Sequence, residues 1–150
     1  MRLTRNFYCR DVLEVAPGLL GKKLVRRSNT SQDVFVITEV EAYRGEEDGA
    51  CHARFGKTNR NGVMYETGGF VYVYLVYGMY WMFNIVTGPA GHPQAVLIRG
   101  LEGIKGPGRL TRELGIDSYF CSSPNKQSHE QQIHNRYFFW MSQNPFPQVV

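Results

Sequence analysis

The chain has 150 residues, with 17 Lys and Arg against 13 Asp and Glu and a formal net charge of +4. Its 43% hydrophobic and 20% charged residues are those of an ordinary globular protein, long enough for one domain but short for two. No apolar run of about 18 residues and no signal-peptide pattern occurs. We therefore expect a soluble intracellular protein, in the cytoplasm or nucleoid of a bacterium or the nucleus of a eukaryote. The basic balance is compatible with a nucleic-acid partner.

The cysteines and histidines do not predict a metal site. Cys9, Cys51 and Cys121 are odd in number and widely spaced, which is neither a disulfide framework nor a Cys-x-x-Cys pattern, so free thiols are expected. His52 follows the acidic run EED, but no second histidine follows at ligand spacing. We expect no metal and no cofactor.

The first predicted element is a short helix over residues 11–21. Asp11 is a residue type that caps helix N-termini, and Gly21 is one that follows helix ends. Pro17 lies inside the segment, and because proline lacks an N–H to donate, we expect a break or kink there. Residues 22–27 then predict a strand.

A longer strand is predicted over residues 34–43, after a turn at 28–33. Alternation divides its side chains between two faces. One set is Val34, Val36, Thr38, Val40 and Ala42, and the other is Phe35, Ile37, Glu39, Glu41 and Tyr43. A carboxylate at the end of such a strand can act as a general base. A pair of solvated strand carboxylates is the alternative.

Residues 44–69 carry no strand pattern and little helix pattern. A 26-residue loop is unusual in so small a domain, and such loops are commonly functional or disordered. The aromatic residues within it favour a function. His52 lies in this loop, where a surface or capping role is the alternative to a catalytic one.

The stretch VYVYLVYGMYWMFN, residues 71–84, predicts a hairpin with its tip near Gly78. It contains four tyrosines, and each buried tyrosine hydroxyl needs a partner. They are Tyr72, Tyr74, Tyr77 and Tyr80. A three-residue tip at 77–79 would place Tyr74 and Asn84 on one face, whereas a two-residue tip would separate them.

Residues 94–100 predict a strand that carries Arg99 among apolar residues. Because the charge of an arginine cannot be shed, Arg99 needs a carboxylate partner, for which Glu41 and Glu39 are the candidates. A purely structural ion pair is the alternative.

The last confidently patterned segment, residues 106–115, predicts a short helix. Pro107 stands near its first position and Gly115 follows its end. The residues from 118 onward are polar and then aromatic and predict no definite element.

Four blocks of the sequence together resemble one protein family. They are TEVEAYRGEEDGACHA, NRNGVMYETGGFVYVYLVYGMYWMFNIV, AVLIRGLEG and GPGRLTRELGI. In order and spacing they are similar to the alkyladenine (3-methyladenine) DNA glycosylase family, over roughly residues 3–117. The resemblance implies one α+β domain spanning residues 1–150. It also implies a curved antiparallel sheet, short surrounding helices and a protruding DNA-intercalating hairpin.

The resemblance assigns roles to the hairpin and to the base pocket. Members of the family rotate a damaged nucleotide out of the duplex. Tyr77 would be the wedge that fills the vacated space, with Met79 at the same tip, and the tyrosines of the hairpin would face DNA. The residues implied to form the base pocket are Tyr43, His52, Tyr74 and Asn84, of which Asn84 would crowd the 2-amino group of guanine.

The implied reaction is hydrolysis of an N-glycosidic bond. Glu41 would activate the water and Arg99 would help to hold it. The substrates would be alkylated or deaminated purines of the 3-methyladenine, 7-methylguanine, hypoxanthine and ethenoadenine class in double-stranded DNA. Because no lysine occupies the matched base position, we expect a monofunctional enzyme that leaves an abasic site without cutting the strand. A DNA-scanning enzyme is also expected to act as a monomer.

Basic residues outside the pocket are candidates for contact with the DNA backbone. They are Lys57, Arg60, Lys105 and Arg109, together with Arg54. The helix that begins at GPG could also present backbone N–H groups to a phosphate. Surface charges without such a role are the alternative.

The resemblance weakens in residues 118–150. A P-R-I-G-I-like stretch of the family has no counterpart, and residues 135–150 resemble its closing strand after a deletion. Within that strand, residues 137–139 would offer a carbonyl to the attacking water. The second hypothesis is accordingly a non-catalytic binder of damaged or distorted DNA, inactive because of the shortened region. A third is an RNA-binding domain that stacks bases on exposed aromatic residues.

Overall fold

The structure is a computed structural model, and it describes residues 2–27, 31–120 and 138–142, the last of these for the backbone only. The helices are α1 (Arg5–Tyr8), α2 (Val12–Leu19) and α3 (Pro107–Leu114), with 3-10 turns η1 (Gly62–Tyr65) and η2 (Ser118–Phe120). The strands are β1 (Lys23–Arg27), β2 (Gln32–Arg44), β3 (Val71–Val76), β4 (Tyr80–Val86), β5 (Gln94–Leu101), β6 (Ile104–Lys105) and β7 (Phe138–Ser142).

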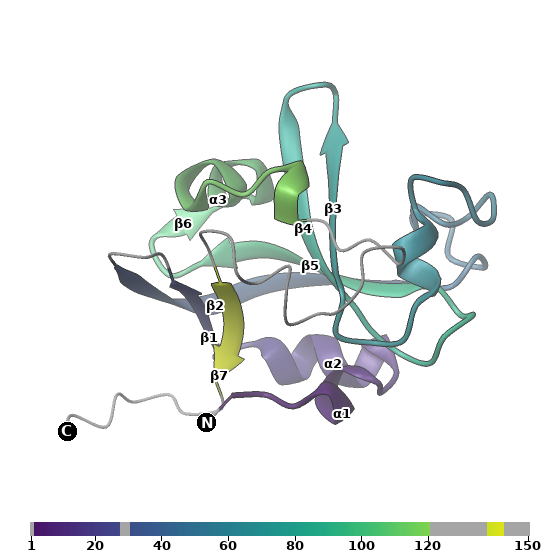
Figure 1. Cartoon of the computed structure of the whole chain (residues 1–150), viewed down its shortest axis with the longest axis horizontal. Helices are drawn as coiled ribbons and strands as arrows, with labels where there is room; N and C mark the ends of the chain where they lie inside the picture. Colours follow the sequence, from purple (N-terminus) through teal and green to yellow (C-terminus); the bar gives the residue numbers. More distant parts are fainter. Residues whose placement is uncertain (1, 28–30, 121–137, 143–150) are drawn as a thin grey trace.

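The strands form one antiparallel sheet in the order β3-β4-β5-β2-β1-β7, with β6 paired to β5. Figure 1 shows the β3–β4 hairpin projecting from the body of the molecule, with α3 beside it and α1 and α2 at the opposite end. The predicted α+β class, with an antiparallel sheet, short helices and a protruding hairpin, is confirmed.

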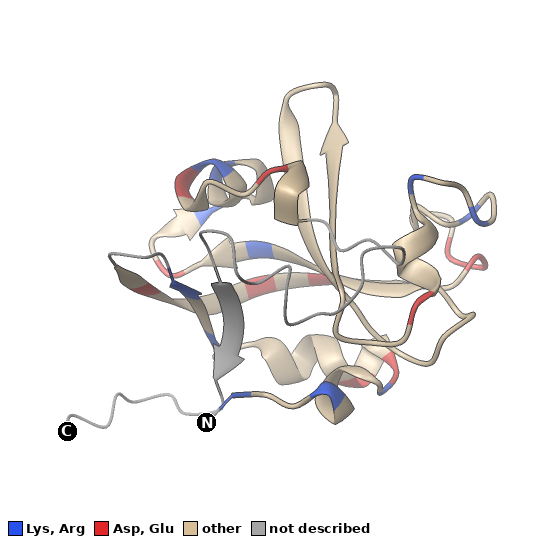
Figure 2. Cartoon of the chain, viewed as in Figure 1, with Lys and Arg blue, Asp and Glu red and all other residues tan. Residues whose placement is uncertain are grey.

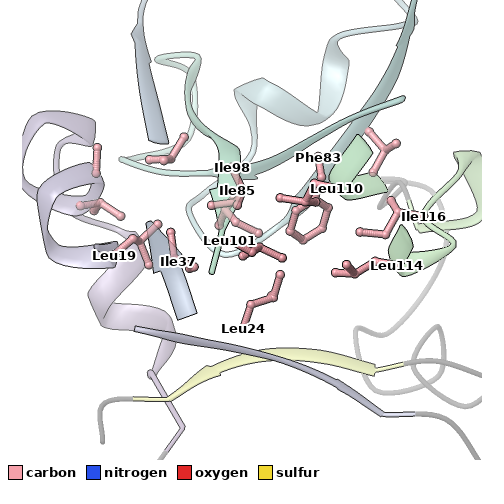
Figure 3. Close-up of a cluster of buried hydrophobic side chains, with 14 of the residues drawn as sticks. Leu19, Leu24, Ile37, Phe83, Ile85, Ile98, Leu101, Leu110, Leu114 and Ile116 are labelled. Carbon is pink, nitrogen blue, oxygen red and sulfur yellow. The ribbon is translucent and has the colours of Figure 1, made fainter. Parts of the chain in front are cut away.

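The main hydrophobic core lies where α2 and α3 pack on the sheet (Figure 3). Its fully buried side chains include Leu19 from α2, Leu110 and Leu114 from α3, and Leu24, Ile37, Phe83, Ile98 and Leu101 from the strands. Each buried side chain of this size stabilises the fold by roughly 1.5–3 kcal/mol. The core therefore holds the face of the sheet that α2 and α3 cover, and leaves the other face for different contacts.

The helix α2 begins and ends where its sequence predicts. The Asp11 carboxylate accepts a hydrogen bond of 3.0 Å from the backbone N–H of Leu13, and Gly21 follows the end with φ of 75°. Pro17 does not break the helix, which continues to Leu19. Pro17 lacks the N–H that would donate to the carbonyl of Leu13, so its place inside the helix costs one hydrogen bond.

A bulge in β2 changes which residues face the main core. Ile37 pairs with Leu101, and both belong to that core; three positions further on, Val40 pairs with Ile98 and both pack there too. Under strict alternation, residues three positions apart would lie on opposite faces. Register shifts on either side of Glu39 mark the irregularity at which the strands change face.

The predicted division of β2 into two faces was therefore wrong. Ile37 and Phe35 do not share the face of Glu41 and Tyr43, because they pack with the main core on the other side. Strict alternation holds on each side of the bulge but not across it. The bulge therefore lets one continuous strand place Phe35 and Ile37 on the main core and Glu41 and Tyr43 on the opposite face.

The β3–β4 hairpin has the three-residue tip that was one of two possibilities. Val76 pairs with Tyr80, leaving 77–79 as the tip, and Met79 N–H donates to Val76 O at 3.1 Å. Tyr77 and Gly78 both have positive φ, of 53° and 68°, the pattern of a type I′ turn. Among the described residues, Tyr77 is the only one other than glycine with positive φ.

The helix α3 supports the hairpin from the side. Pro107 is its first residue and Gly115, in the left-handed conformation, closes it as predicted. The Thr111 hydroxyl donates to the carbonyl of Trp81 at 2.9 Å. A Cβ atom on Gly108 would lie 2.6 Å from the Tyr80 ring, so only glycine permits this close approach.

The remaining expectations are met in part. Residues 22–27 and 94–100 are strands as predicted, and 44–69 contain only η1. Of the turn predicted at 28–33, residues 28–30 lie outside the described residues, whereas Gln32 and Asp33 belong to β2. The segment 135–150 lies largely outside the described residues, although β7 falls within it and pairs with β1. Cys9 and Cys51 are free thiols. No helix in the described ranges is long and apolar enough to cross a membrane.

Candidate active site

The candidate site lies on the face of the sheet opposite the main core. Glu41 on β2 pairs with Leu97 on β5, Leu97 pairs with Asn84 on β4, and Asn84 pairs with Tyr72 on β3. Because paired residues point to the same face, these side chains form one row across four strands. The row brings together residues that lie more than fifty positions apart in the sequence.

A neighbouring row places Tyr43 beside Ala95 and Val86, within a second apolar cluster. This cluster also receives side chains from the long loop, namely Cys51, Ala53, Val63 and Met64. The buried side chains of the loop explain why it takes a definite position although it has almost no regular secondary structure.

The Glu41 carboxylate is held by two donors. Its Oε2 accepts a hydrogen bond of 2.5 Å from the Tyr43 hydroxyl, and its Oε1 accepts one from Arg99 Nη1. Arg99 Nε lies 3.2 Å from Glu39 Oε1, a charge contact outside hydrogen-bond geometry. The predicted carboxylate partner of Arg99 is therefore found, and both candidates contribute. The Glu41 side chain is 37% exposed, so water can reach it.

The two donors keep their protons under ordinary conditions. The hydrogen bond and charge of Glu41 raise the pKa of Arg99. Burial, followed by the hydrogen bond to Glu41, raises the pKa of Tyr43. In their hydrogen bonds to Glu41 both groups are therefore the donors.

The aromatic cluster, defined here as Tyr43, His52, Tyr72 and Tyr74, lies next to that carboxylate. The rings of His52 and Tyr74 have centroids 4.5 Å apart at 35°, and those of Tyr72 and Tyr74 are 5.2 Å apart at 26°. Burial, and then the charge of Glu41, raises the pKa of Tyr74. The charge of Glu41 therefore acts on Tyr74. Three of the four residues implied to form the base pocket, Tyr43, His52 and Tyr74, lie together in this cluster.

Tyr72 has a role that the sequence did not reveal. Its side chain is 1% exposed, so it does not face DNA, and that expectation was wrong for this tyrosine. Its hydroxyl lies 2.5 Å from Nδ1 of His52. Burial, and then the charge of Arg60, lowers the pKa of His52, which favours a neutral imidazole. The i, i+2 spacing from Tyr74 was the available signal, because it places both tyrosines on one face.

Asn84 is buried and belongs to the same row of side chains as Glu41, with Leu97 between them. Its amide Nδ2 donates to the carbonyls of Tyr72 at 3.3 Å and Met82 at 3.2 Å. The three-residue tip places it on the face of Tyr74, as one of the two predicted registers required. The amide is fixed in orientation by these bonds.

The hairpin tip carries the implied wedge residues. The Tyr77 side chain is 86% exposed and that of Met79 is 64% exposed, and both extend beyond the last paired residues of the hairpin. The positive φ of Tyr77 costs about 1 kcal/mol relative to glycine. An exposed aromatic residue held in a strained conformation has no evident benefit for folding.

The basic residues proposed for the DNA backbone lie in two places. Lys57 and Arg60 belong to the loop that carries His52, and Arg60 Nη2 donates to Leu75 O at 2.5 Å. Lys105 lies on β6, and Arg109 on α3, where its Nε is 3.4 Å from Glu113. Figure 2 shows basic residues both on this loop and around α3, on either side of the hairpin.

Two further sequence expectations concern metals and the closing strand. No group of three or more His, Cys, Asp or Glu able to hold a metal ion occurs in the part of the chain described. Phe138 and Phe139 pair with Arg27 and Arg26 at the far edge of the sheet. By strand rise this is roughly 25 Å along β2 from Glu41, so their carbonyls are not at the carboxylate. Residue 137 lies outside the described ranges.

Comparison with known proteins places this arrangement in a family. The family model for methylpurine-DNA glycosylase (MPG) matches residues 6–106. Proteins named "Putative 3-methyladenine DNA glycosylase" are similar to the chain. That of Borrelia garinii subsp. bavariensis is 46% identical over 130 residues, covering 79% of this chain and 70% of its own length. That of Wolbachia pipientis is 50% identical over 135 residues (85% and 72%), and that of Legionella pneumophila strain Corby is 42% identical over 151 residues (96% and 79%). The chain therefore belongs to the methylpurine-DNA glycosylase family of DNA repair enzymes.

Proposed function

We propose that the protein flips alkylated or deaminated purines out of double-stranded DNA and hydrolyses their N-glycosidic bonds with water activated by Glu41. The single observation that carries this proposal is the Glu41 carboxylate, held by Tyr43 and Arg99 beside the contacting rings of His52 and Tyr74. A base stacked on this cluster would present its sugar to the carboxylate; because the two ring centroids are 4.5 Å apart, a base can enter between them only if the rings separate.

Extrusion of the base is the first step. Removing a nucleotide from the stack costs a few kcal/mol, least where damage has already weakened pairing. The exposed Tyr77 ring at the hairpin tip, with Met79 beside it, would replace the lost stacking in the duplex. The strained backbone of Tyr77 supports this role, because strain at an exposed residue is commonly kept for function.

The aromatic cluster suits an alkylated purine. A base such as 3-methyladenine is cationic, and each electron-rich ring attracts a cation by roughly 0.5–2 kcal/mol. A neutral His52, which the lowered pKa favours, would stack on a cation without repulsion. The fixed amide of Asn84 would crowd the 2-amino group of normal guanine and so discriminate against it.

Bond cleavage would then follow from the carboxylate. The bond between C1′ of the sugar and the base nitrogen breaks, and its electron pair leaves with the base. The oxygen of water bonds to C1′, and Glu41 accepts the proton that the water loses. In its ionised form the same carboxylate stabilises the positive charge that develops on the sugar. Arg99 holds the carboxylate in place for this attack.

The same geometry supports a monofunctional enzyme. The side chains that contact Glu41 among the described residues are a tyrosine and an arginine. Neither is the primary amine that forms a Schiff base with the sugar. The product would be an intact strand with an abasic site.

A glycosylase assay tests this proposal. Duplexes that contain one hypoxanthine or one 3-methyladenine are incubated with the protein, and the strand is then cleaved with alkali to reveal abasic sites. The proposal predicts cleavage only after alkali. Binding of the damaged duplex without any base release would instead favour the second function, a non-catalytic binder of damaged DNA.

A further inference from the structure

Phe55 on the long loop is used neither by the fold nor by the proposed reaction. The Phe55 side chain is 84% exposed, and the Arg54 guanidinium carbon lies 4.5 Å from the centroid of its ring. An isolated exposed apolar residue needs no explanation by itself. The position of Phe55 in the molecule is the reason to infer a function for it.

The backbone on either side of Phe55 is tied to the loop that carries the aromatic cluster residue His52. Asn61 is 3% exposed, and its Nδ2 donates to His52 O at 3.3 Å and to Gly56 O at 3.0 Å. These two carbonyls flank the segment that carries Phe55. Arg54 Nη1 also donates to Gly49 O at 2.9 Å. The backbone that carries the exposed ring is therefore preorganised, and binding would cost little backbone conformational entropy.

The segment that carries Phe55 is basic, although the same loop also carries Glu46, Glu47 and Asp48. Residues 54–60, RFGKTNR, contain three cations and no anion. Arg60 bonds to Leu75 O on the strand that leads to the hairpin tip, so this basic loop lies against the hairpin. Figure 2 shows basic positions on this loop, beside the projecting hairpin. A surface of this sign, next to a DNA-intercalating hairpin, complements phosphodiester backbone.

We propose that Phe55, backed by Arg54, stacks on a nucleotide that flanks the extruded one. This inference rests on the proposed function, because it requires His52 to contact the extruded base. Phe55 follows His52 by three residues, a span of at most about 10 Å. Successive nucleotides on one strand are about 3.4 Å apart along the helix axis, so the ring reaches a neighbour within about three steps. Tyr77 would fill the space that the extruded nucleotide leaves in the duplex, while Phe55 contacts the neighbouring nucleotide of the same DNA strand.

The test combines affinity with its salt dependence. Phe55→Ala should weaken binding of a hypoxanthine duplex roughly fivefold to hundredfold, the range for loss of one aromatic stack. The slope of log affinity against log salt should stay unchanged, because a phenyl ring neutralises no phosphate. Lys57→Gln should instead reduce that slope by about one if it contacts a phosphate. Base release at saturating protein should be unchanged in Phe55→Ala, since the ring does not touch the reacting atoms.

Two further variants keep the test decisive. Phe55→Trp should retain affinity, and its additional fluorescence should be quenched by the duplex. Leu13→Ala, which removes an exposed apolar side chain from α2, a helix that Figure 1 shows away from the projecting hairpin, should bind as the native protein does. Native affinity in Phe55→Ala, or unchanged fluorescence in Phe55→Trp, would overturn the inference. If the native protein releases the base normally, either of these results refutes only the role of Phe55 and leaves the proposed function standing. If the native protein releases no base, the proposed function itself is refuted.

Discussion

Arg99 on β5 donates a hydrogen bond to the carboxylate of Glu41 on β2, although 58 positions separate the two residues in the chain. The antiparallel pairing of the two strands makes the contact, and Glu39, beside the bulge in β2, contacts the same guanidinium. Arg99 therefore fixes the direction in which the Glu41 carboxylate points.

Replacing Arg99 by lysine should separate positioning from charge. A lysine keeps the positive charge but cannot contact Glu41 and Glu39 through two nitrogens of a planar group. We expect Arg99→Lys to slow base release in single turnover by roughly tenfold to hundredfold, as misplacement of a reacting group does. Affinity for the damaged duplex should change little. The control is Arg27→Lys, which changes an exposed arginine on β1 and should leave the rate unchanged. A native rate of base release in Arg99→Lys would show that the guanidinium fork is not needed.

Relieving the strain at Tyr77 should exchange function for stability. Asparagine tolerates positive φ better than tyrosine does, so Tyr77→Asn should raise the free energy of unfolding by up to about 1 kcal/mol. The same change should reduce excision from duplex DNA, because the wedge is lost. Thermal unfolding and a base-release assay measure the two effects. An unchanged excision rate would argue against the wedge role, and Tyr77→Phe is the control that keeps the ring.

Gly108 tests whether α3 sets the position of the hairpin. In an ordinary helix, glycine to alanine is favourable by up to about 1 kcal/mol. At Gly108 the new Cβ would lie 2.6 Å from the Tyr80 ring and 3.2 Å from Tyr80 Cβ, so the hairpin itself must move. Gly108→Ala should therefore destabilise the protein by roughly 1–3 kcal/mol. Gly49→Ala, with no atom within 4 Å of the added Cβ, is the matched control and should unfold at the native temperature.

The lowered pKa of His52 predicts the sign of a pH effect. Its folded-state pKa lies below the unfolded value of about 6.5, so the unfolded chain takes up the proton first as the pH falls. The native protein should then lose stability as the pH drops from about 6.5 towards the folded-state pKa. His52→Gln cannot take up this proton and should lose less stability over that range. Parallel pH dependences in the two proteins, measured by thermal unfolding, would contradict a desolvated neutral imidazole.

The sequence was sufficient for elements that are marked by local chemistry. Asp11 and Gly21 define the ends of α2, and Pro107 and Gly115 define those of α3. Each acts through its own backbone or a neighbouring N–H, so the pattern alone carries the information. The carboxylate partner of Arg99 was also foreseeable, because a permanent charge on a buried strand must be compensated.

Features that depend on pairing between distant segments were not foreseeable. The face change at Glu39 arises where β2 meets β5, and nothing in the local alternation marks it. The hairpin register depends on how two residues at the tip turn, for which two lengths were possible. The contact of Tyr72 with His52 joins a strand to an irregular loop, whose course no periodic pattern predicts.

The most direct test of the account is single-turnover base release by Glu41→Gln from a duplex that contains hypoxanthine. The substitution keeps the shape of the side chain but removes its capacity to accept the proton from water. The account predicts that Glu41→Gln releases the base roughly 10²- to 10⁴-fold more slowly than the native protein and still binds the damaged duplex. The control, Glu14→Gln on the exposed face of α2, should release the base at the native rate. Release by Glu41→Gln at close to the native rate would contradict it.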